Sequence, residues 1–199
     1  GKAREPREDL ASIALAMLFM FIVFYCGFLL TGVVEEKSSR VVEVLLSRLR
    51  PTELLAGKIL GIGLVGLAQF ALVAGAALVA LAMSENTLAP ETTPSTMGWI
   101  VFWFVLGYGF YSVLYATAGS LVSRQEEAES LQFPITAVLI VAYFVSMEAA
   151  QSPDGAAAVV GSLFPPTAPM VMIARIAHGG VPWWQIGLSV ALMVVTVYG

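Results

Sequence analysis

The stretch EEKSSRVVEVLLSRLRPTELLAGK, residues 35–58, decides the fold through its contrast with the sequence on either side. Two runs of 25 residues, 10–34 and 59–83, flank it and contain no Lys, Arg, Asp or Glu. A helix of that length rises about 37 Å, which exceeds the ~30 Å hydrocarbon core of a bilayer. The pattern therefore predicts two membrane-spanning helices joined by a charged connection.

Three further apolar runs, 99–122, 131–147 and 182–199, extend the same pattern along the chain. Hydrophobic residues make up 58% of the sequence and charged residues 12%, about half the charged share of a typical soluble domain. Lipid offers backbone polar groups no hydrogen-bonding partner, and the runs lack the alternation of apolar and polar residues that membrane strands show. We therefore predict an all-α membrane protein, a polytopic helical bundle with five transmembrane helices in a membrane domain of residues 10–199.

The positive charges in the loops predict how the chain is oriented. Loops 35–58 and 123–130 hold six of the ten Lys and Arg residues, whereas the two loops on the opposite side hold only Arg175. Cytoplasmic loops are enriched in Lys and Arg, so loops 35–58 and 123–130 are predicted to be cytoplasmic. The remaining three positive charges lie in residues 1–9, which we expect to be the tail of an extracellular domain, because large translocated domains escape the charge rule.

Within the charged connection, apolar residues recur at helical spacing and predict a short amphipathic cytoplasmic helix over about residues 36–50. Its apolar stripe consists of Val41, Val42, Leu45, Leu46 and Leu49. Pro51 then ends the helix before the chain re-enters the membrane. Three environments suit such a helix: the lipid headgroups, the protein's own loops, or a groove on a partner protein.

Glycine residues cluster around the start of the second apolar run. Gly57 and Gly61 form a G-x-x-x-G pattern, which lets two membrane helices approach closely. Gly61, Gly63 and Gly66 also match the G-x-G-x-x-G fingerprint of dinucleotide-binding folds, but no predicted strand precedes them and they lie in an apolar helix. We therefore predict that these four glycines pack helices together.

Four polar side chains within the spans are candidates for lining a translocation path: Gln69, Tyr108, Tyr111 and Tyr115. A buried amide in a membrane helix usually bonds to a neighbouring helix, and tyrosines near helical spacing usually pack in the core. Both interpretations stay open for these residues. No Asp, Glu, Lys or Arg lies in the middle of a predicted span, which disfavours a proton relay or a dedicated ion site.

The arrangements of residues that common catalytic sites need are missing from the sequence. It has one His and one Cys, distant from each other, and neither H-E-x-x-H nor G-x-S-x-G. A phosphate-binding loop ending at Lys58 would need Gly at position 52 and Ser or Thr at position 59, where Thr52 and Ile59 stand. We therefore predict a protein without enzymatic activity, cofactor or metal. The small net charge of −4 gives no reason to expect nucleic acid as a partner.

Several stretches together carry a family resemblance. They are GVVEEKSSRVVEVLLS at 32–47, LLAGKILG at 54–61, Gln69, FPPTAPM at 164–170, Arg175 and VPWWQ at 181–185. In this order they resemble the permease subunits of ABC-2 type transporters, and most closely the NatB-like sodium-efflux permeases. The resemblance implies that the chain is a fragment of a six-helix permease, whose first helix and extracellular domain precede residue 10. It also implies an external re-entrant hairpin in the loop 148–181.

The resemblance further implies a role for the amphipathic helix 36–50. It would be the coupling helix, held in a groove of a separate ABC ATPase subunit that binds ATP and Mg²⁺. The coupling residues would be Glu36, Lys37, Arg40, Val42, Glu43, Leu45, Leu46 and Leu49. A complete transporter would pair two permeases, identical or different, with two ATPases in the bacterial cytoplasmic membrane.

The function implied is export, driven by ATP, of sodium, a drug or another small or amphiphilic molecule. The alternative is a passive channel or a structural membrane subunit without ATPase coupling. Binding of an ATPase distinguishes the two, because neither alternative needs an amphipathic cytoplasmic helix.

Overall fold

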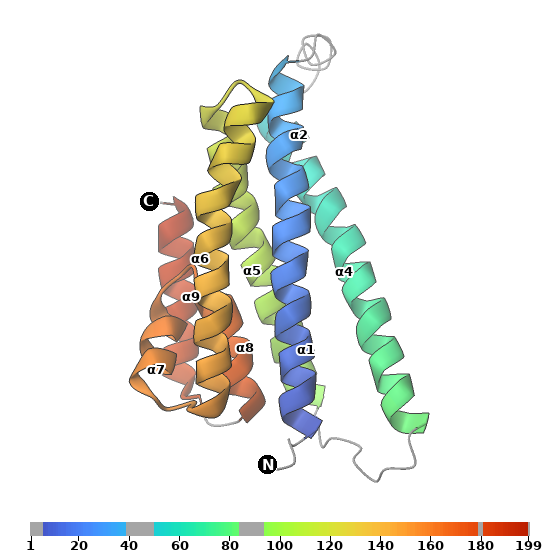
Figure 1. The fold of residues 1–199 in the computed structure, drawn as a ribbon, viewed down its shortest axis with the longest axis vertical. Helices are drawn as coiled ribbons and strands as arrows, with labels where there is room; N and C mark the ends of the chain where they lie inside the picture. The colour runs from blue at the N-terminus through green and yellow to red at the C-terminus, as the bar shows by residue number, and fades with distance from the viewer. Residues whose placement is uncertain (1–5, 39–49, 84–93, 179–180, 199) are drawn as a thin grey trace.

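The computed structural model describes residues 6–38, 50–83, 94–178 and 181–198 of the chain, and all regular structure in these ranges is helical. The first rod consists of α1 (Pro6–Phe21), the π-helix η1 (Ile22–Cys26) and α2 (Gly27–Ser38), which follow one another without a break (Figure 1). The remaining helices are α4 (Pro51–Met83), α5 (Pro94–Leu121), α6 (Gln125–Gln151), α7 (Ala156–Leu163), α8 (Ala168–His178) and α9 (Trp183–Tyr198). The predicted all-α fold is confirmed for the described residues.

Four helical stretches of the described chain are long and apolar enough to cross a membrane. They are Leu15–Glu35, Glu53–Val73, Gly98–Leu121 and Gln125–Gln151, and each overlaps one of the first four predicted spans. The fifth predicted span, 182–199, corresponds to α9, which has 16 residues and is shorter than these four. The chain is thus built from multiple membrane-spanning helices, while a fifth crossing by α9 stays a prediction.

The start of α6 differs from the sequence prediction. The predicted span 131–147 begins three residues before Pro134, whereas the helix begins at Gln125 and Pro134 lies well inside it. The first turn instead contains Glu126 and Glu127, whose negative charges interact favourably with the N-terminal end of the helix dipole. Part of the charged stretch predicted as a loop is therefore helical.

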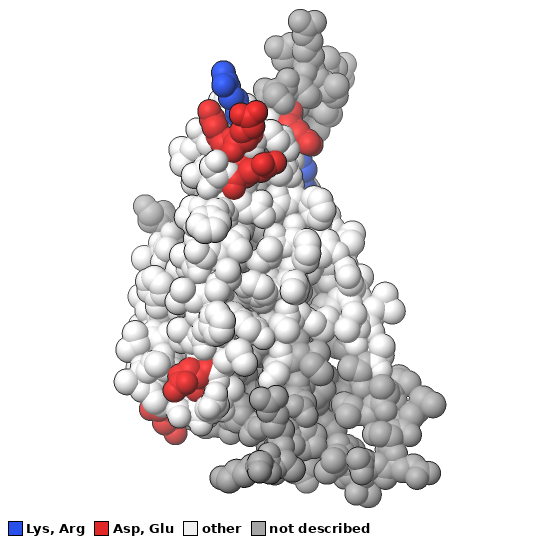
Figure 2. Space-filling view, in the orientation of Figure 1, with Lys and Arg blue, Asp and Glu red and all other residues white. Residues whose placement is uncertain are grey.

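Charged side chains gather at the two ends of the bundle. The C-terminal end of α2, the start of α4 and the turn between α5 and α6 lie together at one end (Figure 1). The charged residues of this end whose side chains the structure describes are Glu35, Arg50, Glu53, Lys58, Arg124, Glu126, Glu127 and Glu129. Figure 2 shows an uncharged band between it and the acidic residues near the opposite end. Both predicted cytoplasmic loops therefore join helices at the same end, as the predicted topology requires.

The core lies around α8, the most deeply buried helix of the described chain. α8 packs against α1, α5, α6 and α7, and its residues 170–175 are at most 1% exposed. α4 is the opposite case, because among the described elements it contacts only the first rod and α5 closely (Figure 1). Only 11% of its apolar stretch is buried, against 56% in α5, so α4 is the least tightly held of the candidate spans.

Candidate functional site: a groove between the first rod and α4

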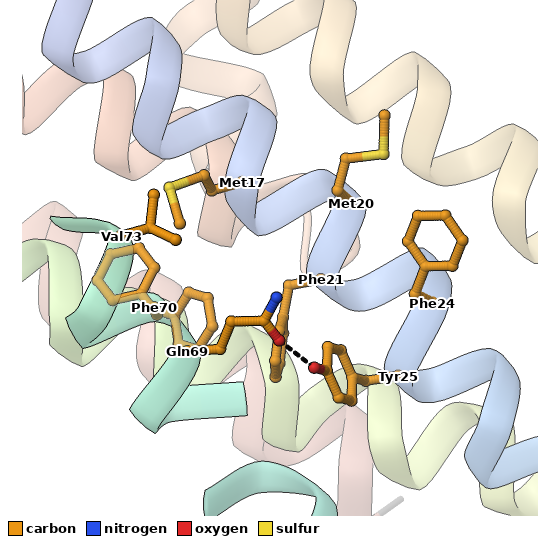
Figure 3. Close-up of a pocket in the computed structure, with 9 residues that line it drawn as sticks. Met17, Met20, Phe21, Phe24, Tyr25, Gln69, Phe70 and Val73 are labelled. Atoms are coloured by element: carbon orange, nitrogen blue, oxygen red, sulfur yellow. Dashed lines mark hydrogen bonds between the residues drawn. The ribbon is translucent and has the colours of Figure 1, made fainter. Parts of the chain in front are cut away.

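A groove of about 330 Å³ separates the first rod from α4, with α5 at its base (Figure 3). It is lined by Met17, Met20, Phe21, Phe24, Tyr25, Gln69, Phe70, Val73 and Phe104. The residues come from α1, η1, α4 and α5, and nearly all have apolar or aromatic side chains. The groove therefore combines a large apolar wall with very few polar groups.

The π-helix η1 contributes Tyr25, one of the two polar side chains that line the groove. Phe21, the residue before η1, stacks on Tyr25 with ring centroids 4.4 Å apart. The Phe21 ring also contacts Phe104 and Tyr108 of α5, at centroid distances of 4.6 and 5.4 Å. Single π-turns inside longer helices frequently mark functional sites, and here the turn lies at the level of the groove.

Tyr25 and Gln69 form a hydrogen-bonded pair across the groove. The Tyr25 hydroxyl donates to the Gln69 side-chain oxygen, which joins the first rod to α4 (Figure 3). Gln69 thus bonds to a neighbouring helix, which is one of the two roles considered for it from the sequence. Its role in a translocation path stays a prediction.

Two of the four glycines bring α4 close to aromatic rings. A Cβ atom added at Gly66 would overlap the Phe21 ring, and one at Gly63 would lie 2.6 Å from the Tyr108 ring. Only glycine allows these approaches. The Tyr108 hydroxyl also donates to the Ile59 carbonyl at 2.9 Å, a second tie between α5 and α4.

Gly57 and Gly61 lie elsewhere on α4. A Cβ atom at either position would meet nothing within 4 Å in the described chain, and both residues are exposed. The described residues therefore supply no neighbour for this G-x-x-x-G pattern. Close packing at these two glycines stays a prediction about another helix.

The three candidate tyrosines face different neighbours. Tyr108 lies beside the groove, whereas Tyr111 donates at 2.5 Å to the Pro166 carbonyl between α7 and α8. Tyr115 is fully buried beside Thr136 of α6. The structure thus brings Gln69 and Tyr108 to the α4 side of α5, and directs Tyr111 and Tyr115 toward other helices. A path lined by any of them stays a prediction.

Arg175 is a buried cation whose role the sequence analysis missed. Its side chain is 1% exposed, and it donates hydrogen bonds of 2.8 Å to three groups. The acceptors are the Pro153 carbonyl before α7, the Ser162 hydroxyl of α7 and the Gln185 side-chain oxygen of α9. Burial lowers the pKa of the guanidinium from its usual value and nearby Asp154 opposes that shift, yet arginine remains charged in proteins. The signal in the sequence was a lone Arg within an apolar helical stretch.

The comparison with protein families decides what kind of chain this is. The model of the family described as ABC-2 family transporter protein matches residues 2–198. The chain belongs to this ABC-2 family. It is 31% identical over 213 residues to the uncharacterized protein YhaP of Bacillus subtilis, covering 99% of this chain and 50% of that protein. It is 32% identical over 181 residues to the uncharacterized protein MJ1024 of Methanocaldococcus jannaschii, covering 91% of this chain and 44% of that protein.

Membership of the ABC-2 family confirms the broad interpretation of the sequence. The chain is a multi-pass membrane protein of the permease type found in ABC transporters. It spans about half the length of the curated relatives it matches. No solved structure matches the chain. The narrower NatB-like subtype stays a prediction.

The predicted coupling residues of this ABC-2 chain fall mostly outside the described residues. Those outside are Arg40, Val42, Glu43, Leu45, Leu46 and Leu49. Glu36 and Lys37 belong to the last helical turn of α2, at the charged end. On the far side of the connection, α4 begins at the predicted break, Pro51, and the Arg50 N–H donates to the Glu53 carboxylate at 3.0 Å. Proline and a carboxylate are favoured in a first helical turn, which explains why α4 starts there.

Proposed function

We propose that this chain is part of the permease subunit of an ABC exporter in the cytoplasmic membrane. ATP and Mg²⁺ would be bound by a separate ATPase subunit, and two permease copies, identical or different, would complete the transporter. Membership of the ABC-2 family and the candidate membrane spans support this proposal. The observation that carries it is the amphipathic pattern of residues 36–50, which connects two helices that meet at the charged end.

The proposed coupling acts through the apolar stripe of the connection. Val42, Leu45 and Leu46 would dock in a groove of the ATPase, with Lys37 and Glu43 at the edges. The connection is continuous in sequence with both α2 and α4. Displacing it by ATPase closure would therefore move α4 more readily than the tightly packed α5 or α8, because fewer of the described elements pack against α4 than against either of those helices.

The experiment that tests this function is capture of the tagged protein from native membranes. We expect an ATP-hydrolysing subunit to accompany the wild-type protein. The double variant Leu45→Asp, Leu46→Asp is expected to lose that subunit while remaining in the membrane, because it places charge on the docking stripe. A matched control, Ser39→Asp with Ser47→Asp, adds the same charge to the same connection at polar positions and is expected to retain the subunit.

Two results would oppose the proposal in different ways. Capture of an ATPase by the Leu45→Asp, Leu46→Asp variant at the wild-type level would refute coupling through this stripe. Absence of any ATP-hydrolysing subunit from the wild-type sample would refute the exporter itself, and would favour the passive channel or structural subunit.

A further inference from the structure

We propose that the groove between the first rod and α4 binds a neutral amphiphile that enters from the bilayer. The ligand has an aromatic or aliphatic body and one hydrogen-bond acceptor, which pairs with the Gln69 amide. Binding at this groove needs only the described residues, whereas the idea that the ligand is the transported substrate rests on the proposed function.

The size and wall of the groove suit such a molecule. Its volume of about 330 Å³ is at the lower end of the range of small-molecule sites, roughly 300–1,000 Å³. Met17 and Met20 supply flexible, polarizable side chains that adapt to different ligand shapes. Phe24, Phe70 and Phe104 supply flat apolar surface.

The polar pair determines which group the ligand carries. Gln69 accepts the Tyr25 proton through its oxygen, and its NH₂ group keeps two donors. Figure 3 shows the amide nitrogen turned away from Tyr25, toward the middle of the groove. A polar donor in an apolar medium is costly unless it is hydrogen-bonded, so a ligand carbonyl, ether or hydroxyl oxygen gains a bond here that lipid chains cannot supply.

The uncharged lining of the groove favours an uncharged ligand. None of the nine described lining residues is Asp, Glu, Lys or Arg. Moving an isolated ion into an apolar site without a counter-charge costs far more free energy than its interactions with two neutral polar side chains recover. The groove therefore favours a neutral molecule over a bare cation such as sodium.

The position of the groove indicates the route of entry. Its lining residues lie within the candidate spans and away from the charged end. Met20, Phe24 and Val73 at its edges are 54%, 60% and 42% exposed. Exposed apolar edges at that depth face lipid in a membrane-spanning chain, so a ligand dissolved in the bilayer reaches the groove sideways.

Photolabelling with benzophenone tests the proposal directly. Benzophenone is neutral and has two apolar rings and one carbonyl acceptor. On irradiation its carbonyl oxygen takes the hydrogen atom from a nearby C–H group, preferably of methionine, and the two carbon radicals then combine to form a carbon–carbon bond. The protein is captured with its native partners and placed in phosphatidylcholine nanodiscs. We expect saturable labelling of Met17 or Met20, detected by mass spectrometry. Met147, an exposed methionine of α6 outside the groove, reports simple partitioning into lipid.

Variants separate specific binding from general labelling. Gln69→Leu removes the donor and is expected to weaken labelling of Met17 and Met20 about five-fold, which is the change in affinity expected from the net free energy of one hydrogen bond. Val73→Trp fills the groove from α4 and is expected to abolish labelling of Met17 and Met20. Gln151→Leu, a matched change at an exposed glutamine near the end of α6, is expected to change nothing. Labelling of Met147 should be equal in all samples, which shows equal access of the probe to the membrane, and an unchanged Tm shows that the variants are folded.

Two outcomes would overturn the proposal. Labelling of Met17 and Met20 that rises linearly with benzophenone, in parallel with Met147, would show partitioning only. Labelling of Met147 without Met17 and Met20 would show that another helix or a second copy covers the groove. Both outcomes are independent of ATPase capture, so a failure here and a failure of the exporter proposal are distinguishable.

Discussion

Replacing Arg175 by Met tests how α7, α8 and α9 are held together. The Arg175 side chain donates to the Pro153 carbonyl, and to Ser162 and Gln185, at 2.8 Å each. Hydrogen bonds to a charged group contribute about 1.5–3 kcal/mol each. Methionine fills much of the same space and donates nothing, so the variant removes the bonds and largely keeps the packing.

We expect Arg175→Met to lower the free energy of unfolding by about 3–5 kcal/mol, because the buried acceptors lose their donor and each buried polar group left unsatisfied costs about 1–3 kcal/mol. The loss is smaller than the sum of three such bonds because methionine no longer carries the cost of burying a charge. Ser162 also keeps its own bond to the Val159 carbonyl at 2.8 Å. At about 2–4 °C per kcal/mol for a domain of this size, the Tm should fall by roughly 6–20 °C.

The assay is thermal unfolding in detergent together with hydrogen exchange of residues 156–178. Arg124→Met, at the exposed charged end, is the matched control and should leave both measurements unchanged. Arg175→Lys should lie between the two, because a compact ammonium cannot reach three separate acceptors as a guanidinium does. Equal Tm and equal exchange for Arg175→Met and Arg124→Met would refute the idea that this side chain holds the three helices.

Two further predictions concern the first rod and α4. Gly66→Leu should lower the free energy of unfolding by about 1–3 kcal/mol or more, because the new side chain would overlap the Phe21 ring. Gly61→Leu should leave the stability of this chain unchanged. Thermal unfolding of both variants checks this prediction, and equal losses of stability would contradict it. Cys26 is fully buried, so a maleimide should label it only after unfolding; rapid labelling of the folded protein, measured by mass spectrometry, would show that the rod opens near η1.

The sequence predicted the helices well because uncharged runs of that length have few alternatives in lipid. It placed the start of α6 too late, since charge was treated as a loop signal and Glu126 and Glu127 instead occupy a first helical turn. The π-helix at Ile22–Cys26 left no signal in a run that is apolar throughout. Local hydropathy therefore located the spans but not their ends or their irregular turns.

The candidate site was predictable only in part, because each position depends on which side of a helix faces a neighbour. Gln69 stood out as an amide in an apolar run, but its partner Tyr25 did not. The glycine pattern was noticed as a unit, yet Gly66 contacts an aromatic ring and Gly61 contacts nothing in the described chain. Arg175 was counted as a loop charge, although its three acceptors come from segments up to 22 residues away.

The contrast between the two halves of the bundle suggests how the proposed exporter would move. α8 is enclosed by α1, α5, α6 and α7, and Arg175 ties it to α7 and α9, so this half would behave as one rigid body. Among the described residues, α4 contacts the rest of the chain through ring contacts at Gly63 and Gly66, the Tyr25–Gln69 pair and the Tyr108–Ile59 hydrogen bond. A push on the charged connection would therefore be absorbed at the interface between α4 and the first rod. That interface is the groove. On the proposed function, the width of the groove would therefore change with the state of the ATPase, and its affinity for a neutral ligand would change with it.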